Sequence, residues 1–226
     1  MTPVEKAIKL RKSLHLRSKA PQIAFQRRLE MPRAILKCVE EHELNSRLFN
    51  EARRHYVVCL CSAFELYWRD FIKQTVDANK IGNIDIRRLR NHKFSFSDLQ
   101  LILGQRLTLG ELIANSYTFQ GTEVLNQVCQ DIFSVDLFAG ISKIQFTYVE
   151  PKTLKESTPS FLKGVEILKH RDDIDRCFSI RHETVHNTGT QFRVSQKTLR
   201  NLEGTMGLFN LFASIVLESK LKTQQE

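Results

Sequence analysis

Residues 181–186 carry the side chains of this chain that are best suited to chemistry. Their sequence is Arg-His-Glu-Thr-Val-His, which fits two catalytic motifs at once. Counted from His182 it is H-E-x-x-H, in which two imidazoles bind one zinc ion and Glu183 activates a water molecule. Counted from Arg181 it is R-x4-H, which suits acid–base chemistry on a phosphate without a metal. The two interpretations share His186 and differ in metal, substrate and fold.

The zinc interpretation makes three residues functional: the ligands His182 and His186 and the general base Glu183. The longer form of the motif requires a third His at position 192, where this chain has Phe192. Glu203 and Glu218 are available as a carboxylate ligand instead, but no supporting motif surrounds either of them. The charged residue before the first His and the lack of a predicted strand before the helix also count against zinc.

The motif is predicted to lie on a helix over residues 171–187. At ~100° per residue, Arg181 falls in the middle of an apolar stripe. A cation there needs a partner, a polar cavity or a second chain, because unpaired burial is costly. Arg181 and His186 are ~140° apart on a regular helix. We therefore expect them to share a surface only if the helix loosens near residue 186 or if two copies face each other across a dimer axis. The stripe consists of Ile174, Cys177, Phe178 and Val185.

Residues 180–189, with the sequence Ile-Arg-His-Glu-Thr-Val-His-Asn-Thr-Gly, resemble the R-x4-6-H signature of the HEPN superfamily. In that family a polar residue, often Asn, follows the Arg, and Asn or Gly often follows the His. Asn187 agrees with this pattern, whereas His182 replaces the commoner Asn and leaves the role of that position open. Residues 62–71 resemble the helix of RiboL-PSP-type HEPN proteins, in which an acidic residue and an aromatic recur in a similar pattern.

The resemblance covers about residues 50–80 and 165–220, and it implies an all-α fold, a HEPN-like antiparallel helical bundle. We expect one domain over all 226 residues, with a core of about residues 22–80 and 160–221 and a mainly helical insertion or subdomain over about 81–158. The resemblance also implies a homodimer with a composite active site that cuts RNA with no metal or other cofactor. A HEPN-like dimer that binds RNA or nucleotides without cutting would carry much the same motif.

The residues of the motif support ribonuclease chemistry on their own terms. A ribose 2′-hydroxyl must lose a proton to attack the adjacent phosphate, and His186 can accept it near neutral pH. Charge then builds on the phosphorane, to which Arg181 can donate two hydrogen bonds. His182 would orient the RNA or protonate the leaving 5′-oxygen, and Asn187 would contact the phosphate or cap the helix. The products would be a 2′,3′-cyclic phosphate and a 5′-hydroxyl.

Other residues are expected to support this site. Glu65 is predicted to hold His186 or Arg181 from the neighbouring helix, or to pair with Arg69 four residues further on. A role as the toxin of a toxin–antitoxin pair, or as an anti-phage defence effector, would add a cognate antitoxin or a defence-system protein as a partner. Basic residues expected to contact RNA are Arg87, Arg88, Arg90 and Arg193.

The elements that position the motif are predicted to be helical almost throughout. The strongest helix covers residues 50–78, where apolar side chains recur at i, i+3, i+4 and i+7. Gly204 and Gly207 weaken the last helix unless another backbone packs closely there. The other predicted elements are helices over 22–48, broken or started at Pro32, over 97–104, 108–116, 121–133, 135–142 and 195–221, and a short strand over 146–149.

The composition indicates a globular, basic protein. Lys and Arg number 34 against 25 Asp and Glu, a net charge of +9, which favours a polyanionic partner such as nucleic acid. The five cysteines contain no C-x-x-C pair and are expected to be buried thiols in a reducing compartment. The basic N-terminus lacks the apolar core of a signal peptide, and no stretch reaches the ~18–20 apolar residues of a membrane span. These features predict a cytoplasmic protein that does not enter a membrane.

Overall fold

The computed structural model describes residues 21–42, 46–78, 95–148, 160–186 and 194–223. Within these ranges the chain is almost entirely helical, as the all-α prediction requires, with one short two-stranded hairpin. The elements in chain order are α2 (Pro21–Glu41), α3 (Ser46–Asp77), α5 (Phe96–Gln105), α6 (Leu109–Ser116), α7 (Thr122–Phe133), α8 (Leu137–Ser142), β1 (Gln145–Tyr148), β2 (Ser160–Lys163), α9 (Gly164–Lys169), α10 (Arg171–His186) and α11 (Gln196–Thr223).

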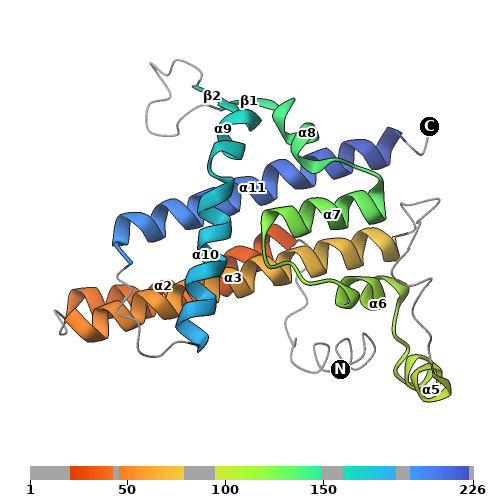
Figure 1. Ribbon diagram of the computed structural model, residues 1–226, viewed down its shortest axis with the longest axis horizontal. Helices are drawn as coiled ribbons and strands as arrows, with labels where there is room; N and C mark the ends of the chain where they lie inside the picture. Colours follow the sequence, from red (N-terminus) through yellow and green to blue (C-terminus); the bar gives the residue numbers. More distant parts are fainter. Residues whose placement is uncertain (1–20, 43–45, 79–94, 149–159, 187–193, 224–226) are drawn as a thin grey trace.

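The long helix α3 is the centre of the arrangement. It packs along α2 on one side and contacts α6, α10 and α11 (Figure 1). Helix α10 crosses α3 and packs against α11 and α7 as well, so it contacts three helices besides its chain neighbour α9. Helix α5 projects away from the rest of the described molecule (Figure 1).

Aromatic side chains of α3 form the middle of the core. Trp68 and Tyr67 are almost fully buried and point toward α11. Trp68 Nε1 donates a hydrogen bond of 2.9 Å to the side-chain oxygen of Asn210, and the Tyr67 hydroxyl donates one of 3.2 Å to the Asn210 backbone oxygen. Asn210 interrupts an apolar stretch of sequence and is fully buried, and these two donors satisfy its two oxygens.

The middle of the chain shares this core. Ile113 of α6, Leu125 of α7 and Leu137 of α8 are completely buried and belong to the same hydrophobic cluster as the aromatic residues of α3. The predicted helices of this region are present to within one or two residues of the expected bounds. The segment predicted as an insertion therefore contributes directly to the packing around α3.

Helix α2 continues through Pro32, so the predicted break or start at that residue is wrong. Proline in a helix interior removes one backbone hydrogen bond and strains the preceding turn. Tertiary contacts on both sides of Pro32 outweigh this cost. Phe25 and Leu29 are fully buried before it, and the Arg33 guanidinium after it pairs with Glu203 of α11.

The strand predicted over residues 146–149 is present one residue earlier, as β1. It pairs antiparallel with β2, from Gln145 opposite Lys163 to Tyr148 opposite Ser160. Neither β2 nor the six-residue helix α9 was predicted. Both are very short, and β2 exists only through pairing with a strand distant in sequence, which local patterns do not reveal.

Gly164 lies where α9 and α8 meet at very short range. A Cβ atom at this position would overlap the backbone oxygen of Ile141, and the Gly164 amide donates a 2.9 Å hydrogen bond to Ile144. Gly164→Ala should therefore lower the free energy of unfolding by about 1–3 kcal/mol, because the two helices must move apart. The change is measured by denaturant titration followed by circular dichroism.

Gly204 provides the matched control for that substitution. Among the described residues, no neighbour lies within 4 Å of a Cβ built there, so the close backbone packing considered for this part of α11 is absent. Gly204→Ala should raise the free energy of unfolding by up to about 1 kcal/mol, because alanine favours the helix. Equal effects of the two substitutions would contradict the close approach at Gly164.

Candidate active site

Helix α10 carries the motif and remains helical through His186. Asp172 and Asp173 lie in its first turn, where the helix dipole favours negative charge. Val185 was predicted to lie in the buried stripe, and this is wrong, since it is 54% exposed. The helix leaves the core before that residue, and its last turn lines an open groove. The buried side chains of α10 are Ile174, Cys177, Phe178 and Ile180.

Two pairs of side chains join α10 to α3 on successive turns. Cys61 and Cys177 lie 3.5 Å apart at Sγ, and one turn further along both helices Glu65 pairs with Arg181. The two residues of each pair are 116 positions apart in the sequence. The chain therefore runs in the same direction along both helices where these pairs lie. Phe178 extends the contact with an edge-on packing against the ring of Phe64, 5.7 Å between centroids.

The thiol pair is structural. The hydrogen bond from Cys61 to Cys177, followed by burial, holds the pKa of the Cys61 thiol far above its ordinary value. A neutral buried thiol is a poor nucleophile, so this pair does not supply one to the site. Cys129 is also buried, with its pKa raised by burial, whereas Cys38 is exposed, contrary to the prediction that the cysteines are buried.

Arg181 has the partner that its position in the apolar stripe predicts. Its Nη1 donates to Oε1 of Glu65, whose side chain is only 8% exposed, while the Arg181 side chain is 26% exposed. The other carboxylate oxygen of Glu65 lies 3.7 Å from Nη2 of Arg69. Of the three partners predicted for Glu65, Arg181 and Arg69 are therefore both in place. Two guanidinium groups share one carboxylate, which leaves one net positive charge at the edge of the core.

The two imidazoles lie side by side on the exposed face of α10. The ring centroids of His182 and His186 are 4.6 Å apart, with 48° between the ring planes. Both side chains are exposed, so each ring is accessible to a bound molecule. Both histidines follow Arg181 within the next turn and a half of α10, and Arg181 is held in place by its ion pair with Glu65 of α3.

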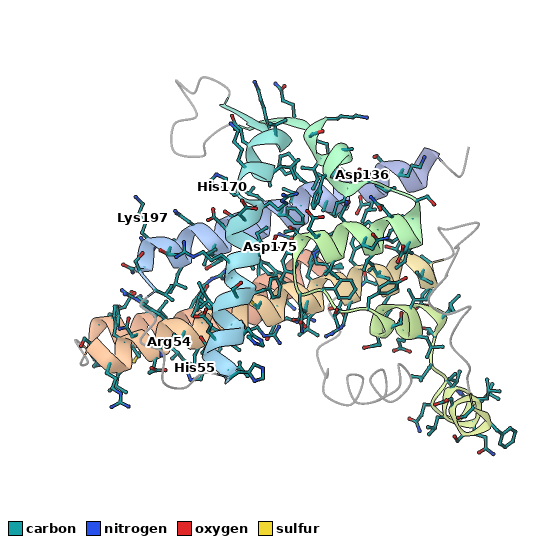
Figure 2. All side chains as sticks on the ribbon, in the orientation of Figure 1. Arg54, His55, Asp136, His170, Asp175 and Lys197 are labelled. Atoms are coloured by element: carbon teal, nitrogen blue, oxygen red, sulfur yellow. The ribbon has the colours of Figure 1, made fainter. Side chains whose placement is uncertain are left out.

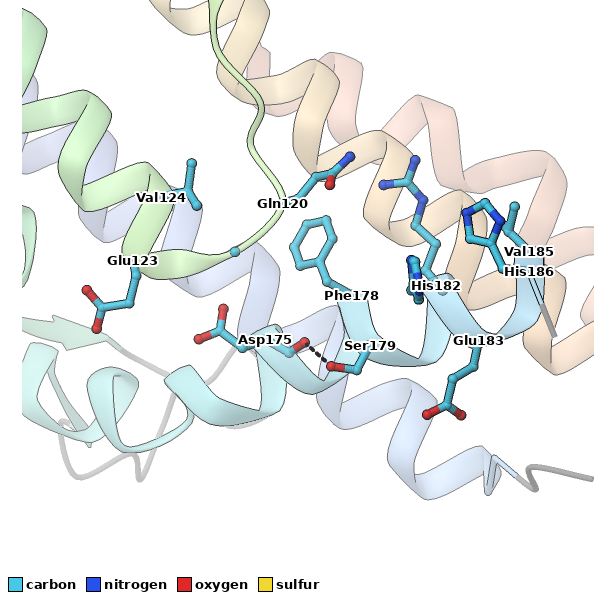
Figure 3. Close-up of a pocket in the computed structure, with 12 residues that line it drawn as sticks. Gln120, Glu123, Val124, Asp175, Phe178, Ser179, His182, Glu183, Val185 and His186 are labelled. Atoms are coloured by element: carbon cyan, nitrogen blue, oxygen red, sulfur yellow. Dashed lines mark hydrogen bonds between the residues drawn. The ribbon is translucent and has the colours of Figure 1, made fainter. Parts of the chain in front are cut away.

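An open groove of about 650 Å³ brings these groups together between α10 and the start of α7 (Figure 3). We call it the α10–α7 groove. A cavity of this size is typical of small-molecule and nucleotide sites. It is lined by Gln120, Gly121, Glu123, Val124, Asp175, Phe178, Ser179, Arg181, His182, Glu183, Val185 and His186.

Arg181 and His186 line the same groove within one chain. The expectation that they share a surface only through a loosened helix or a second copy is therefore wrong. The helix is regular to residue 186. Because the last turns of α10 are covered on one side only, the lining residues occupy about 200° of its circumference. A groove that wide reaches both side chains despite the angle between them.

The wall opposite α10 is held in place by Asp175. Its Oδ1 accepts a 2.7 Å hydrogen bond from the backbone amide of Thr122, and its Oδ2 accepts one of 2.9 Å from the Thr122 hydroxyl. Thr122 is completely buried at the start of α7. Gly121, just before it, has a φ of 152°, a conformation that side chains rarely permit. The loop that carries Gln120 is therefore fixed relative to α10.

Several lining residues were not predicted from the sequence. Gln120 lies in the segment assigned as an insertion, far from the motif, and no local pattern connects the two. Asp175 and Ser179 were detectable, because with His182 and His186 they recur at i, i+4, i+7 and i+11 and form one polar stripe of α10. That stripe is the face that lines the groove.

Some predicted residues lie outside the described parts of the chain. They are Asn187 after the motif and the basic residues Arg87, Arg88, Arg90 and Arg193. Their predicted contacts with phosphate or RNA remain predictions.

The zinc interpretation finds no third ligand among the described residues. They contain no group of three or more His, Cys, Asp or Glu side chains that could hold a metal ion. Glu203, one of the two carboxylates considered as a ligand, accepts hydrogen bonds from Arg33 and Tyr56 between α2, α3 and α11. Two imidazoles on one helix face are thus not assembled into a zinc site within the described chain.

A second cavity, of about 460 Å³, lies between α2, α3 and the start of α11. Its charged groups bond to one another: Arg33 and the Tyr56 hydroxyl contact Glu203, and Gln196 donates a 2.9 Å hydrogen bond to Glu40. Burial, together with the Glu203 carboxylate, raises the pKa of the Tyr56 hydroxyl. This network ties three helices together.

Comparison of the chain with protein-family models, with curated proteins and with solved structures found no match. The motif and the geometry of the α10–α7 groove are therefore the basis for a proposed function.

Within the described residues, no helix combines the length and the apolar character needed to cross a membrane.

The contact between Glu65 and Arg181 should be energetically coupled. In a double-mutant cycle with Glu65→Gln and Arg181→Met, we expect a coupling energy of about 1–3 kcal/mol, since the carboxylate is buried and loses its main partner. The exposed pair Lys37 and Glu41, 3.4 Å apart on α2, should give less than about 0.5 kcal/mol. Unfolding of the variants in denaturant measures both values. Similar coupling in the two cycles would show that Glu65 does not anchor Arg181.

Proposed function

We propose that this chain is a metal-independent endoribonuclease of the HEPN type. The observation that carries the proposal is the α10–α7 groove, in which a buried carboxylate anchors Arg181 beside the imidazoles of His182 and His186. A fixed guanidinium next to exposed imidazoles suits general acid–base chemistry on a phosphodiester. The resemblance of residues 180–189 to the R-x4-6-H signature points to the same chemistry.

Arg181 stabilises charge in this mechanism. One of its nitrogens is bonded to Glu65, and the remaining N–H groups are available to the non-bridging oxygens of a phosphate. The anchor orients the guanidinium before substrate arrives, so little entropy is lost when the phosphorane forms. Arg69 on the far side of Glu65 keeps the cluster net positive, which favours an anion at this point of the groove.

The imidazoles move the protons. His186 accepts the proton of the ribose 2′-hydroxyl as that oxygen attacks the adjacent phosphorus, and the bond to the 5′-oxygen of the next nucleotide breaks. His182, one turn earlier, donates a proton to that leaving oxygen. The products are a 2′,3′-cyclic phosphate and a 5′-hydroxyl, and no metal or other cofactor takes part.

The proposal extends to the assembly and its partners. A HEPN-like bundle fits the packing of α3, which carries Glu65, against α10, and the long helix α11 that follows. The net charge of +9 fits an RNA substrate. The resemblance adds a homodimer in which the second subunit contributes to a composite site beside the groove of each chain, and the composition adds a cytoplasmic location. The resemblance also adds a toxin or anti-phage role with an antitoxin or defence-system partner.

Purified protein should cleave single-stranded RNA in the presence of excess EDTA. His186→Ala should lower kcat/KM by about 10²–10⁴-fold, because the general base is lost. Arg181→Ala should lower it by about 10²–10³-fold, because charge stabilisation is lost. Gel analysis of labelled RNA measures cleavage, and the fragments should carry 2′,3′-cyclic phosphate and 5′-hydroxyl ends.

His170 supplies the matched control. Its imidazole is 58% exposed and contacts the Asp173 carboxylate at 3.0 Å. His170 lies just before the start of α10 (Figure 2), and His186 is the last residue of that helix, about 24 Å further along at ~1.5 Å per residue. His170→Ala should cleave as well as the parent. Cleavage by His186→Ala at the parental rate, or loss of activity in EDTA, would overturn the proposal. Binding of RNA without cleavage by the parent would favour the non-catalytic alternative.

A further inference from the structure

The charged and titratable side chains of the α10–α7 groove gather at its two ends. In Figure 3 the carboxylates of Glu123 and Asp175 lie at the α7 end, and the imidazoles of His182 and His186 lie at the other, where α10 also carries Glu183. Arg181 belongs to the histidine end by its place in the chain. A phosphate at the α7 end would meet two carboxylates, of which Glu123 pairs at 3.0 Å with Arg171 from outside the groove lining, so one net negative charge remains there. The groove therefore favours a phosphate at Arg181 over one at the α7 end.

The part of the groove between its two ends is lined by apolar side chains and by one amide side chain. Gln120 and Phe178 lie there, with Val124 beside them on α7 (Figure 3). Among the described residues, no hydrogen-bond partner is found for the Gln120 amide, which is exposed in the groove. An amide offers one acceptor and two donors, and an aromatic or aliphatic surface packs against the face of a base.

The position of Gln120 is fixed before any ligand binds. Phe119 beside it is completely buried, and Gly121 after it is followed by Thr122, which is bonded twice to Asp175 of α10. The Gln120 amide is therefore held in a fixed position relative to the motif helix α10. Rigid polar groups discriminate between ligands better than mobile ones, because little entropy is lost on binding.

We infer that Gln120 determines specificity by binding the base next to the scissile phosphate, an inference that rests on the proposed function. The phosphate lies at Arg181, and the base packs against Val124 and the small exposed edge of the otherwise buried Phe178, with its hydrogen-bonding edge toward the Gln120 amide. Because that edge must be free, the substrate is single-stranded at this position. The carboxylates at the α7 end favour a base with an exocyclic amino group, so uracil binds least well.

The test uses oligodeoxynucleotides that contain a single ribonucleotide, so that only one phosphodiester can be cleaved. The ribonucleotide carries adenine, cytosine, guanine or uracil in four otherwise identical substrates, and a second set varies the nucleotide that follows. In one of the two sets, the parent should cleave the amino-bearing bases at least about tenfold faster than uracil at limiting substrate. Gln120→Ala should raise KM for the preferred substrate about tenfold with kcat nearly unchanged, and should reduce the preference to about twofold.

Gln127→Ala is the matched control, because Gln127 is an exposed amide on α7 that lies outside the groove and donates to Asp131. It should retain the parental KM and preference. Unchanged base preference in Gln120→Ala, with cleavage by the parent, would overturn the inference and leave the proposed function standing. The same would follow if the parent preferred uracil or showed no preference in either set.

A binding measurement separates this inference from the proposed function. Fluorescence anisotropy with RNA versions of the four sequences, each carrying a single 2′-deoxy substitution at the cleavage position, reports base preference without cleavage at that position. If the parent does not cleave but binds with a preference that Gln120→Ala removes, the base site is supported and the nuclease proposal fails. If the parent neither cleaves nor binds these oligonucleotides, both are overturned.

Discussion

The ion pair between Glu65 and Arg181 is the interaction on which the site depends. A carboxylate as deeply buried as that of Glu65 is costly unless a cation and hydrogen bonds compensate it, and Arg181 and Arg69 both do so. The pair lies where the apolar contact between α3 and α10 ends. It holds the last turns of α10 against α3 while leaving their other side open, so the two imidazoles are displayed on a helix that cannot shift. Arg181 can lie within the apolar stripe of α10 because the Glu65 carboxylate of α3 is opposite it and compensates its charge.

The middle of the chain forms the wall of the α10–α7 groove opposite the imidazoles. Helices α6, α7 and α8 pack into the common core around α3, and Asp175 then bonds the start of α7 directly to the motif helix. The groove is therefore built from segments more than 50 residues apart in sequence. Its distribution of charge follows from that construction, because α10 supplies the cation, the imidazoles and Glu183 at one end, and one carboxylate each from α7 and α10 lies at the other. The proposed nuclease chemistry occupies the histidine end, and the proposed base site lies between the two ends.

Much of the fold follows from local pattern. The helices over α3, α5, α6, α7, α10 and α11 were predictable because their apolar side chains recur with helical period or their ends carry capping residues. Helix α2 through Pro32 was not, since contacts with α3 and α11 outweigh the local cost of proline. The hairpin of β1 and β2 needs a partner strand across a loop, and Val185 is exposed because the core ends one turn before it. Each of these departures has a tertiary cause.

The sequence by itself determined the helical class, the motif on α10, the need of Arg181 for a partner and the candidacy of Glu65, because these depend on spacing along one helix and on the cost of burying a charge. Only the tertiary structure decided that Arg181 and His186 share a groove within one chain, that Arg69 and Arg181 divide one carboxylate, and that Gln120 faces the motif. These are relations between helices, and they depend on how far α10 extends beyond the core and on where Asp175 binds α7, which no local pattern specifies.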